Sequence, residues 1–361
     1  MRIVVAMSGG VDSSVAASLL AEAGHEVIGL SMQLYDQQPE GRPNAASPEA
    51  FGSCCSIDDL YDARQVAAAI GIPHYIVNFE ARFAETVVDP FVAEYAAGRT
   101  PIPCVHCNAD LKFATLVERA AGLDAGAVGT GHYARVSYDE DRRRYRLHRG
   151  VDADKDQSYF LFSLTQDQLA RAAFPVGHLT KREVRDHARR LNLPVADKPD
   201  SHEICFVADG DAGGFVERRL DGEDRSGDIV DSGGRVRGRH RGVHRLTVGQ
   251  RKGLGLAEGV PLYVLRLDAA TRQVVVGPRE ELGGQHLNAS RVNWVDGEPP
   301  SGCRRVTARI RHRHRDAPAV VTPLGTDRAS VEFDDPQVAI APGQAVVFYD
   351  GEIVVGVGWI E

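Results

Sequence analysis

The chain has 361 residues, enough for two or three domains that each bury a core. Its composition, 43% hydrophobic and 25% charged, is typical of globular proteins, and no apolar run approaches the roughly 18 residues of a membrane-spanning helix. The formal charge of −8 excludes a general attraction to nucleic acids, unless basic residues are clustered. The sequence starts directly with an apolar segment and no signal-type leader, so we expect a cytoplasmic protein.

The first 200 residues alternate patterns typical of strands and helices, which predicts a parallel sheet covered by helices. The expected strands are 2–7, 26–33, 74–79 and 125–130, and the expected helices are 12–23, 57–70, parts of 81–97, 109–121 and 180–193. Gly24 and Gly71 follow helices, where a residue with positive φ is favoured. Residues 36–52 are rich in Pro, Gly and polar residues and predict a loop.

After about residue 208 the pattern changes to short alternating runs separated by Gly and charged residues. The one helical pattern there covers 213–220, and Tyr349–Glu352 predicts a hairpin turn between two apolar runs. We therefore expect an α/β protein with three domains. These are a parallel-sheet nucleotide-binding domain over 1–208, a small central β-rich domain over 209–280 and a C-terminal β-barrel over 281–361.

The stretch SGGVDSS joins the first strand to the first helix. Backbone N–H groups at a helix N-terminus favour a phosphate, hydroxyl groups add donors, and Asp12 has the ligand chemistry for a phosphate-bound Mg²⁺. The stretch is neither GxxxxGK[ST] nor GxGxxG, and no lysine within it reaches a phosphate. It resembles the pyrophosphate loop of the ATP pyrophosphatase superfamily, which implies ATP as the substrate and AMP transfer to an oxygen.

The six cysteines do not suggest a disulfide framework, because the cytosol keeps thiols reduced. Cys104 and Cys107 in TPIPCVHCN precede a helix expected to start near Asn108, and a helix N-terminus stabilises a thiolate. A CxxC pair is also half of many zinc sites, but a second CxxC is missing from the sequence. Cys205 lies among apolar residues and, taken alone, fits a buried core thiol.

Five motifs occur in a fixed order: PCVHCN, GTGHYAR, KDQSYFL, DSHEICF and TVGQRKGLGL. Together with the glycine turn they make the chain similar to the bacterial tRNA-specific 2-thiouridylases over essentially its whole length. The resemblance implies ATP-dependent 2-thiolation of the wobble uridine of tRNAs for Lys, Glu and Gln. In that chemistry AMP is transferred to the C2 oxygen, and sulfur then arrives as a cysteine persulfide.

The resemblance also implies roles for individual residues. Cys205 matches the persulfide-carrying cysteine and Cys107 its partner nucleophile, and the two are expected to come within disulfide reach during turnover. The ATP-binding positions are Ala6, Met7, Ser8, Gly9, Gly10, Val11, Asp12, Ser13, Met32 and Gly131. The tRNA-contacting positions are His132, Lys155, Asp156, Gln157, Arg311, His312 and Gln344.

One position departs from the family pattern, because Cys104 stands where many members have an aspartate. Cys104, Cys107 and Cys205 form a set that is able to hold a [4Fe–4S] cluster with one open iron. A cluster-bound hydrosulfide and a persulfide relay are therefore both open, and we favour the relay. Cys54, Cys55 and Cys303 are interpreted as structural or incidental.

Two basic runs, residues 235–252 and 304–315, each contain six arginines and no acidic residue. Each is compatible with a solvated charged face, but two such runs in an acidic protein indicate a polyanion such as tRNA. A cysteine desulfurase or sulfur-carrier protein is the implied persulfide donor. Two other classes of protein fit parts of the sequence. One is an enzyme that adenylates and then forms an amide or guanidino product, and the other is a non-catalytic RNA-binding protein with a structural zinc.

Overall fold

A computed structural model describes residues 1–34, 57–200, 204–207, 210–220, 222–256 and 259–361. The loop expected over 36–52 and the cysteines at 54 and 55 lie outside the described residues. The chain forms two compact units, and each is described by itself. The first contains Met1–Val87, Cys104–Gly210 and Glu352–Val354, and the second contains Val88–Pro103, Asp211–Gly351 and Val355–Glu361.

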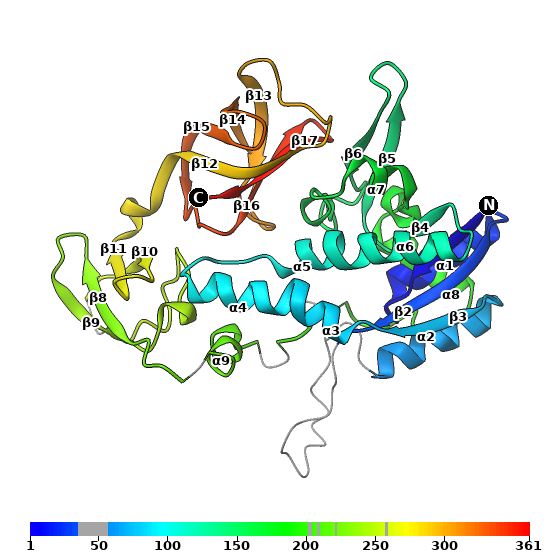
Figure 1. Cartoon of the computed structure of the whole chain (residues 1–361), viewed down its shortest axis with the longest axis horizontal. Helices are drawn as coiled ribbons and strands as arrows, with labels where there is room; N and C mark the ends of the chain where they lie inside the picture. Colours follow the sequence, from blue (N-terminus) through cyan, green and yellow to red (C-terminus); the bar gives the residue numbers. More distant parts are fainter. Residues whose placement is uncertain (35–56, 201–203, 208–209, 221, 257–258) are drawn as a thin grey trace, which may run out of the picture. The chain divides into compact units, whose positions relative to one another are not determined.

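The first unit is built on a parallel sheet with the strand order β3-β2-β1-β4-β7 (Figure 1). Its strands are β1 (Arg2–Ala6), β2 (Glu26–Gln33), β3 (His74–Asn78), β4 (Ala127–Gly129) and β7 (Ala172–Ala173). Its helices are α1 (Val11–Glu22), α2 (Ile57–Ile70), α3 (Glu80–Phe83), α5 (Pro103–His106), α6 (Ala114–Gly122), α7 (Gln166–Arg171) and α8 (Lys181–Arg190). The predicted parallel sheet is therefore confirmed, and β2 and α2 have the predicted bounds.

One face of this sheet carries the main core of the unit. Ile3, Val5 and Met7 pack against apolar residues of α1, α2 and α8, while α6 contacts β1 and β4. Gly24 and Gly71 follow α1 and α2 with φ of 81° and 74°, as predicted. The turn between β1 and α1 therefore joins two elements that are both packed in this core.

Three parts of the first unit differ from the prediction, the first being α7 and β7, for which the sequence indicated no element. An antiparallel hairpin of β5 (Ala134–Asp139) and β6 (Arg144–Arg149) follows β4, where the sequence indicated no strands. The helix expected to begin near Asn108 begins at Pro103 as α5 and continues through a π-helical stretch, η2 (Cys107–Phe113), into α6. Cys107 therefore lies beyond the first helical turn, so the N-terminal stabilisation of a thiolate applies to Cys104 instead.

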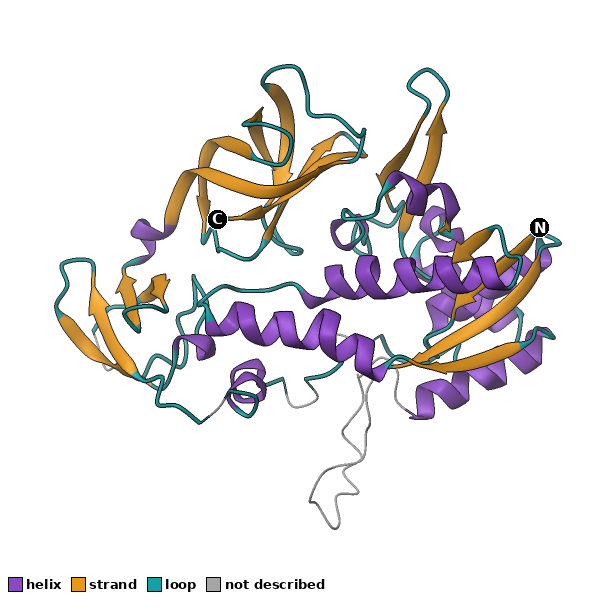
Figure 2. Cartoon of the chain, in the orientation of Figure 1, coloured by secondary structure: helices purple, strands orange, loops and turns teal. Residues whose placement is uncertain are grey.

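The second unit consists mainly of strands (Figure 2). Helices α4 (Asp89–Ala96) and α9 (Ala212–Glu217) pack together, with the rings of Phe91 and Phe215 edge to face at 6.0 Å. A four-stranded sheet follows in the order β10-β11-β8-β9. Its strands are β8 (Gly227–Asp231), β9 (Val236–His240), β10 (Tyr263–Asp268) and β11 (Gln273–Gly277).

The last six strands form a closed barrel, because β12 pairs with both β15 and β17. They are β12 (Gly283–Trp294), β13 (Arg304–Arg309), β14 (Ala317–Pro323), β15 (Ala329–Val338), β16 (Ala345–Asp350) and β17 (Ile353–Ile360). Alternating inward residues such as Ala319, Val321, Val331 and Phe333 fill its core. The predicted β-barrel and the hairpin turn before Ile353 are confirmed, with Gly351 at φ 60°.

Candidate active site

The turn after β1 is shaped for a close approach of backbone groups. Gly9 has φ 72°, and a Cβ on it would lie 2.1 Å from the carbonyl oxygen of Asp59, so only glycine fits. Gly10 is the N-cap of α1 and has no side chain that could accept a hydrogen bond from the first turn. Val11 is the first helical residue. The first N–H groups of α1 therefore have no capping side chain, which is the arrangement that favours an anion.

Serine hydroxyls hold this turn in place. Ser13 Oγ accepts a hydrogen bond from the Ser8 N–H at 3.1 Å and lies 3.1 Å from the Gly10 carbonyl oxygen, to which it donates. Ser14 Oγ also donates to Gly10, at 2.8 Å. These bonds order the predicted phosphate-binding segment from Ala6 to Ser13.

Asp12 is the acidic residue of the turn, and it is 32% exposed. Its carboxylate accepts a hydrogen bond from the Tyr133 hydroxyl at 2.8 Å and two from the Lys181 ammonium at 2.7 and 2.9 Å. Burial and the Asp12 carboxylate raise the pKa of Tyr133, so its hydroxyl remains a donor. A carboxylate that is partly exposed at a phosphate-binding turn has the chemistry to ligate Mg²⁺.

Lys181 and Lys198 are two basic residues of this region that the sequence analysis missed. Lys198 Nζ donates to the Gly9 carbonyl at 3.1 Å, to Asp59 at 2.6 Å and to Asp62 at 2.5 Å. It thereby ties the turn to α2. Thr180 gave a helix-start signal beside Lys181, but nothing in the sequence pairs either lysine with the turn.

Two further ATP positions from the resemblance also lie in the first unit. A Cβ on Gly131 would lie 2.5 Å from the Ser13 nitrogen, so this glycine packs directly on the start of α1. Met32 is buried in β2, at 5% exposure. Gly131 therefore lies directly against the turn that the SGGVDSS residues form.

The four predicted tRNA-contacting residues of the first unit differ in their surroundings. Burial and the Lys112 ammonium lower the pKa of His132 to about 3, so its ring is neutral at physiological pH. Lys155 Nζ lies 2.7 Å from Asp200 Oδ2. Asp156 is buried and accepts hydrogen bonds from the Gly150 and Ser158 N–H groups, while Gln157 Oε1 accepts one from the Tyr133 N–H at 3.0 Å. Asp156 and Gln157 thus tie the KDQSYFL segment to Gly150 and Tyr133.

The cysteines of the first unit lie in two segments that meet at α3. Helix α3 contacts η2, which begins at the buried Cys107, and the Phe83 ring of α3 lies edge-on to Phe206 at 5.5 Å. Phe206 directly follows Cys205, which is partly buried, whereas Cys104 is exposed. Among the residues that the structure describes, no group of three His, Cys, Asp or Glu side chains is arranged to hold a metal ion. The three cysteines therefore do not form a cluster site in this arrangement.

In the second unit a cavity of about 530 Å³ brings Arg311 and Gln344 together. Its polar lining also includes Thr100, Thr247 and Arg279. Gln344 Nε2 donates to the Thr100 carbonyl at 2.9 Å, and Arg311 donates to the Val338 carbonyl at 3.0 Å. His312 is exposed. Thr247 belongs to the TVGQRKGLGL motif, so this motif and two predicted tRNA positions share one cavity.

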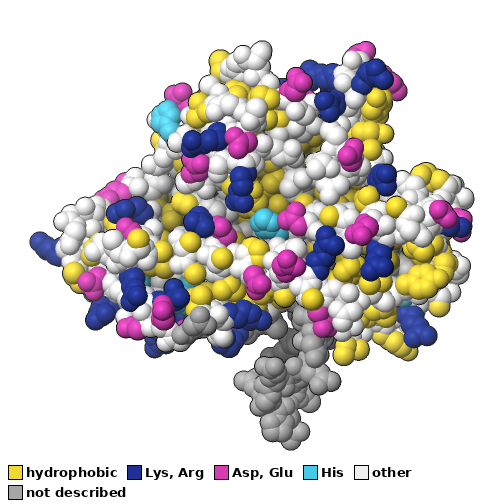
Figure 3. All heavy atoms as spheres, in the orientation of Figure 1, with side chains coloured by type: hydrophobic (Ala, Val, Ile, Leu, Met, Phe, Trp, Pro, Cys, Tyr) yellow, Lys and Arg dark blue, Asp and Glu magenta, His cyan; other side chains and the backbone are white. Residues whose placement is uncertain are grey.

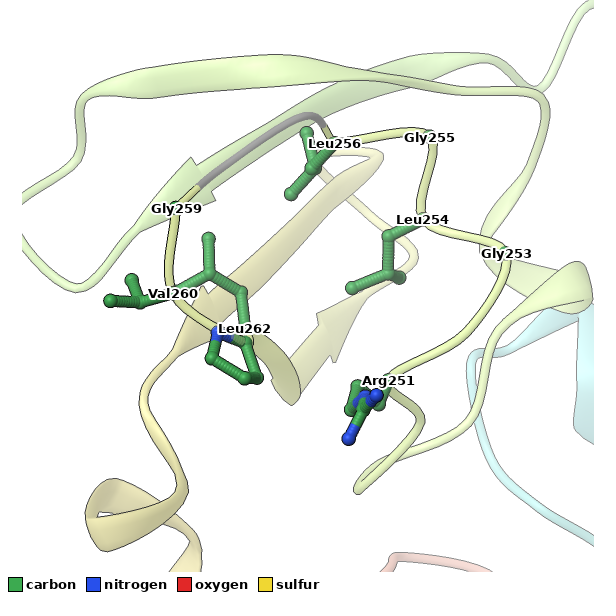
Figure 4. Close-up of a pocket in the computed structure, with 9 residues that line it drawn as sticks. Arg251, Gly253, Leu254, Gly255, Leu256, Gly259, Val260 and Leu262 are labelled. Carbon is green, nitrogen blue, oxygen red and sulfur yellow. The ribbon is translucent and has the colours of Figure 1, made fainter.

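A second cavity, of about 330 Å³, lies along the loop from Arg251 to Leu262 (Figure 4). Leu254, Leu256, Val260 and Leu262 line it together with three glycines and Pro261, and Arg251 is the only charged lining residue among those described. The cavity with Arg311 and Gln344 is the better RNA candidate, because the side chains of two arginines, Arg279 and Arg311, and of Gln344 line it.

Many arginines of the two basic runs are paired with acids from other parts of the second unit. The pairs include Arg237–Asp231, Arg245–Glu217, Arg304–Asp350, Arg305–Asp334 and Arg309–Asp316. Figure 3 accordingly shows basic and acidic side chains interspersed on the visible face. Within the described residues, the basic side chains of these runs that make no ion pair are Arg235, Arg241, Arg251, Lys252, Arg311, Arg313 and Arg315.

No helix among the described residues is long and apolar enough to cross a membrane. Three family models match successive parts of the chain: the tRNA methyl transferase HUP domain (residues 1–209), the tRNA methyl transferase PRC-barrel domain (213–278) and the aminomethyltransferase beta-barrel domain (284–360).

Curated relatives match the whole chain. The tRNA-specific 2-thiouridylase MnmA of Geotalea uraniireducens is 53% identical over 360 residues, which is 100% of this chain and 95% of the relative. The protein of the same name from Solibacter usitatus is 52% identical over 369 residues, covering 99% of each chain. With this identity over its full length, and with three family models matching successive parts of it, the chain belongs to the tRNA-specific 2-thiouridylase family of enzymes.

Proposed function

We propose that this enzyme carries out ATP-dependent 2-thiolation of uridine 34, the wobble uridine, in tRNAs for lysine, glutamate and glutamine. The observation that carries the proposal is the match to 2-thiouridylases over the whole chain at about half identity. The geometry of the turn from Ala6 to Ser13 supports ATP as the second substrate, because it offers uncapped N–H groups next to a carboxylate.

In the first step the C2 oxygen of the uridine attacks the α-phosphorus of ATP. A bond forms between that oxygen and the phosphorus, the bond to the bridging oxygen breaks, and pyrophosphate leaves. Asp12 would hold Mg²⁺, which would neutralise charge on the phosphates. The turn with Gly9 and Gly10 binds the pyrophosphate portion, and Gly131 lets the segment after β4 pack closely against the start of α1.

In the second step the terminal sulfur of a persulfide on Cys205 attacks C2. The Cys107 thiolate then attacks the Cys205 sulfur, which breaks the persulfide S–S bond and forms a Cys107–Cys205 disulfide, and AMP leaves with the former C2 oxygen. A dithiol reductant restores both thiols. The contacts that α3 makes with η2 and with Phe206 support this pairing, because they bring both cysteine segments to one helix.

We favour this relay over a [4Fe–4S] cluster on Cys104, Cys107 and Cys205, since the described side chains do not form a metal-binding group. Anaerobic purification followed by iron and sulfide analysis separates the two. Iron and sulfide that co-purify stoichiometrically, and whose removal abolishes thiolation, would contradict the relay.

For tRNA binding we propose two groups of contacts. His132, Lys155, Asp156 and Gln157 act in the first unit. Arg311, His312 and Gln344 act in the second. A cysteine desulfurase or sulfur carrier supplies the persulfide, and the reaction takes place in the cytoplasm, where thiols stay reduced. Residues 1–208 form the ATP-binding domain, 209–280 the central domain and 281–361 the tRNA-binding barrel.

The test incubates the protein with ATP, Mg²⁺, a cysteine desulfurase, cysteine and unmodified lysine tRNA, followed by a mercury-containing gel that retards thiolated RNA. Wild type should give a retarded band, and Cys205→Ala should give none while still releasing pyrophosphate. Cys303→Ala is the matched control, because Cys303 is exposed in the second unit. A retarded band of full intensity with Cys205→Ala would overturn the assignment of the sulfur carrier.

A further inference from the structure

Four side chains of the first unit form a chain of alternating charge that runs from the nucleotide turn to the KDQSYFL segment. Lys181 Nζ lies 2.7 Å from Asp12 Oδ1 and 2.8 Å from Asp200 Oδ1. Asp200 Oδ2 in turn lies 2.7 Å from Lys155 Nζ. The order is therefore Asp12, Lys181, Asp200, Lys155.

The two inner members of this ion chain are fully engaged. The three N–H donors of Lys181 face Asp12 Oδ1, Asp12 Oδ2 and Asp200 Oδ1, and only 13% of the side chain is exposed. Asp200 is 21% exposed and also accepts a hydrogen bond from Arg185 at 3.1 Å. Burial alone would raise the pKa of Asp200, but the ammonium groups of Lys155 and Lys181 lower it to about 2, so the group is charged at physiological pH.

The two outer members face different substrates under the proposed function, on which this inference rests. Asp12 is the residue proposed for Mg²⁺, and Lys155 is proposed for tRNA. Both are the most exposed members of the ion chain, at 32% and 35%. Asp12 is paired with Lys181, so Mg²⁺ must compete with Lys181 for the Asp12 carboxylate. Lys155 is paired with Asp200, so a tRNA phosphate must compete with Asp200 for the Lys155 ammonium.

We propose that this ion chain couples the binding of tRNA to the binding of Mg²⁺-nucleotide, with Lys181 as the positioning residue. When a tRNA phosphate takes Lys155, Asp200 loses one of its three cations and attracts the Lys181 ammonium more strongly. That shift weakens the hold of Lys181 on Asp12, and the Asp12 carboxylate becomes available to the metal. The same steps run in reverse when the nucleotide binds first, because coupling between two binding sites is reciprocal.

The test measures the dissociation constant of Mg²⁺-bound α,β-methylene ATP with and without saturating lysine tRNA, and that of tRNA with and without the analogue. The methylene bridge blocks AMP transfer, so binding alone is observed. In the wild type each ligand should tighten the other by the same factor, at least about fivefold. In Asp200→Asn and in Lys181→Met, which cut the ion chain at different places, the factor should fall to about one while each ligand still binds alone.

The matched control is Asp197→Asn. Asp197 pairs with Arg189 of the same helix α8 at 2.9 Å, is 80% exposed and lies outside the ion chain, so this variant should keep the wild-type factor. If Asp200→Asn does not fold, Lys181→Met decides. Equal affinities in the wild type with and without the second ligand, or an unchanged factor in both variants, would overturn the inference. A wild type that binds no tRNA would instead overturn the proposed function.

Discussion

Gly131 is the single residue that most simply tests whether the turn after β1 binds nucleotide. A Cβ at this position meets the Ser13 nitrogen at 2.5 Å, and overpacking of this kind costs about 1–3 kcal/mol. We therefore expect Gly131→Ala to weaken binding of α,β-methylene ATP at least about tenfold, measured by titration calorimetry. Gly122→Ala is the control, since a Cβ at this site in α6 meets nothing within 4 Å. Unchanged affinity in Gly131→Ala would show that the nucleotide lies elsewhere.

Asp200 gives a prediction for the pH dependence of stability. Its folded-state pKa of about 2 is below the ordinary value of 3.8, so its contribution is present above pH 3.8 and is lost as the pH falls toward 2. Asp200→Asn should lower the free energy of unfolding by about 2 kcal/mol at pH 7. In urea denaturation, the difference in free energy of unfolding between wild type and variant should be constant from pH 7 to about pH 4. It should shrink between about pH 4 and pH 3. A difference that grows in acid would contradict the ion pairs described for Asp200.

From local patterns, the residues of the site could be predicted only where neighbours in sequence are neighbours in space, whereas the distant Gly131 was predicted from the family resemblance. The glycine turn followed from one strand, one turn and one helix. Lys181 and Lys198 could not be predicted, because they contact Asp12 and Gly9 across 169 and 189 residues. Such contacts depend on how the sheet closes, which a local pattern does not encode. Several arginines of the basic runs likewise form ion pairs with acidic residues that are distant in the sequence.

At the scale of elements, α8 places Lys181 through a capping box. The Glu183 carboxylate accepts hydrogen bonds from the Thr180 N–H at 2.7 Å and hydroxyl at 2.8 Å. Thr180→Ala should cost about 1 kcal/mol and also tighten binding of the Mg²⁺-nucleotide, because Lys181, which competes with the metal for Asp12, is the first residue of the helix.

The matched control is Thr165→Ala. Thr165 forms the same capping box on α7, which carries none of the proposed site residues. Thermal denaturation should report a similar loss of stability for both variants, and calorimetry should report tighter Mg²⁺-nucleotide binding only for Thr180→Ala. Equal nucleotide affinities in the two variants would show that α8 does not position the site.

The bounds of most helices and strands of the first unit follow from their apolar spacing and end signals. The early start of α5 could have been predicted from the sequence, because proline is favoured at the first helical position and Pro103 occupies that position. The hairpin of β5 and β6 could not be predicted from the sequence. Its turn contains Arg143 at φ 52° and no glycine, so the usual hairpin signal is missing.

At the scale of the whole molecule, tRNA binding must overcome a net charge of −8. We expect affinity to fall steeply with salt, because each neutralised phosphate releases counterions. Replacing Arg313 and Arg315, which make no ion pair with the described residues, should reduce the slope of log affinity against log salt by about 2. Filter binding over a KCl series measures the slope. Arg237→Ala is the control, because Arg237 is already paired with Asp231, and an equal slope change there would contradict this surface.

The most direct test of the central claim is nucleoside mass spectrometry of lysine tRNA after incubation with the wild-type enzyme, ATP, Mg²⁺, a cysteine desulfurase and cysteine. The account predicts 2-thiouridine at position 34 alone, formed only when ATP is present and accompanied by AMP and pyrophosphate. Sulfur at C4, sulfur at another position, or 2-thiouridine formed without ATP would contradict it.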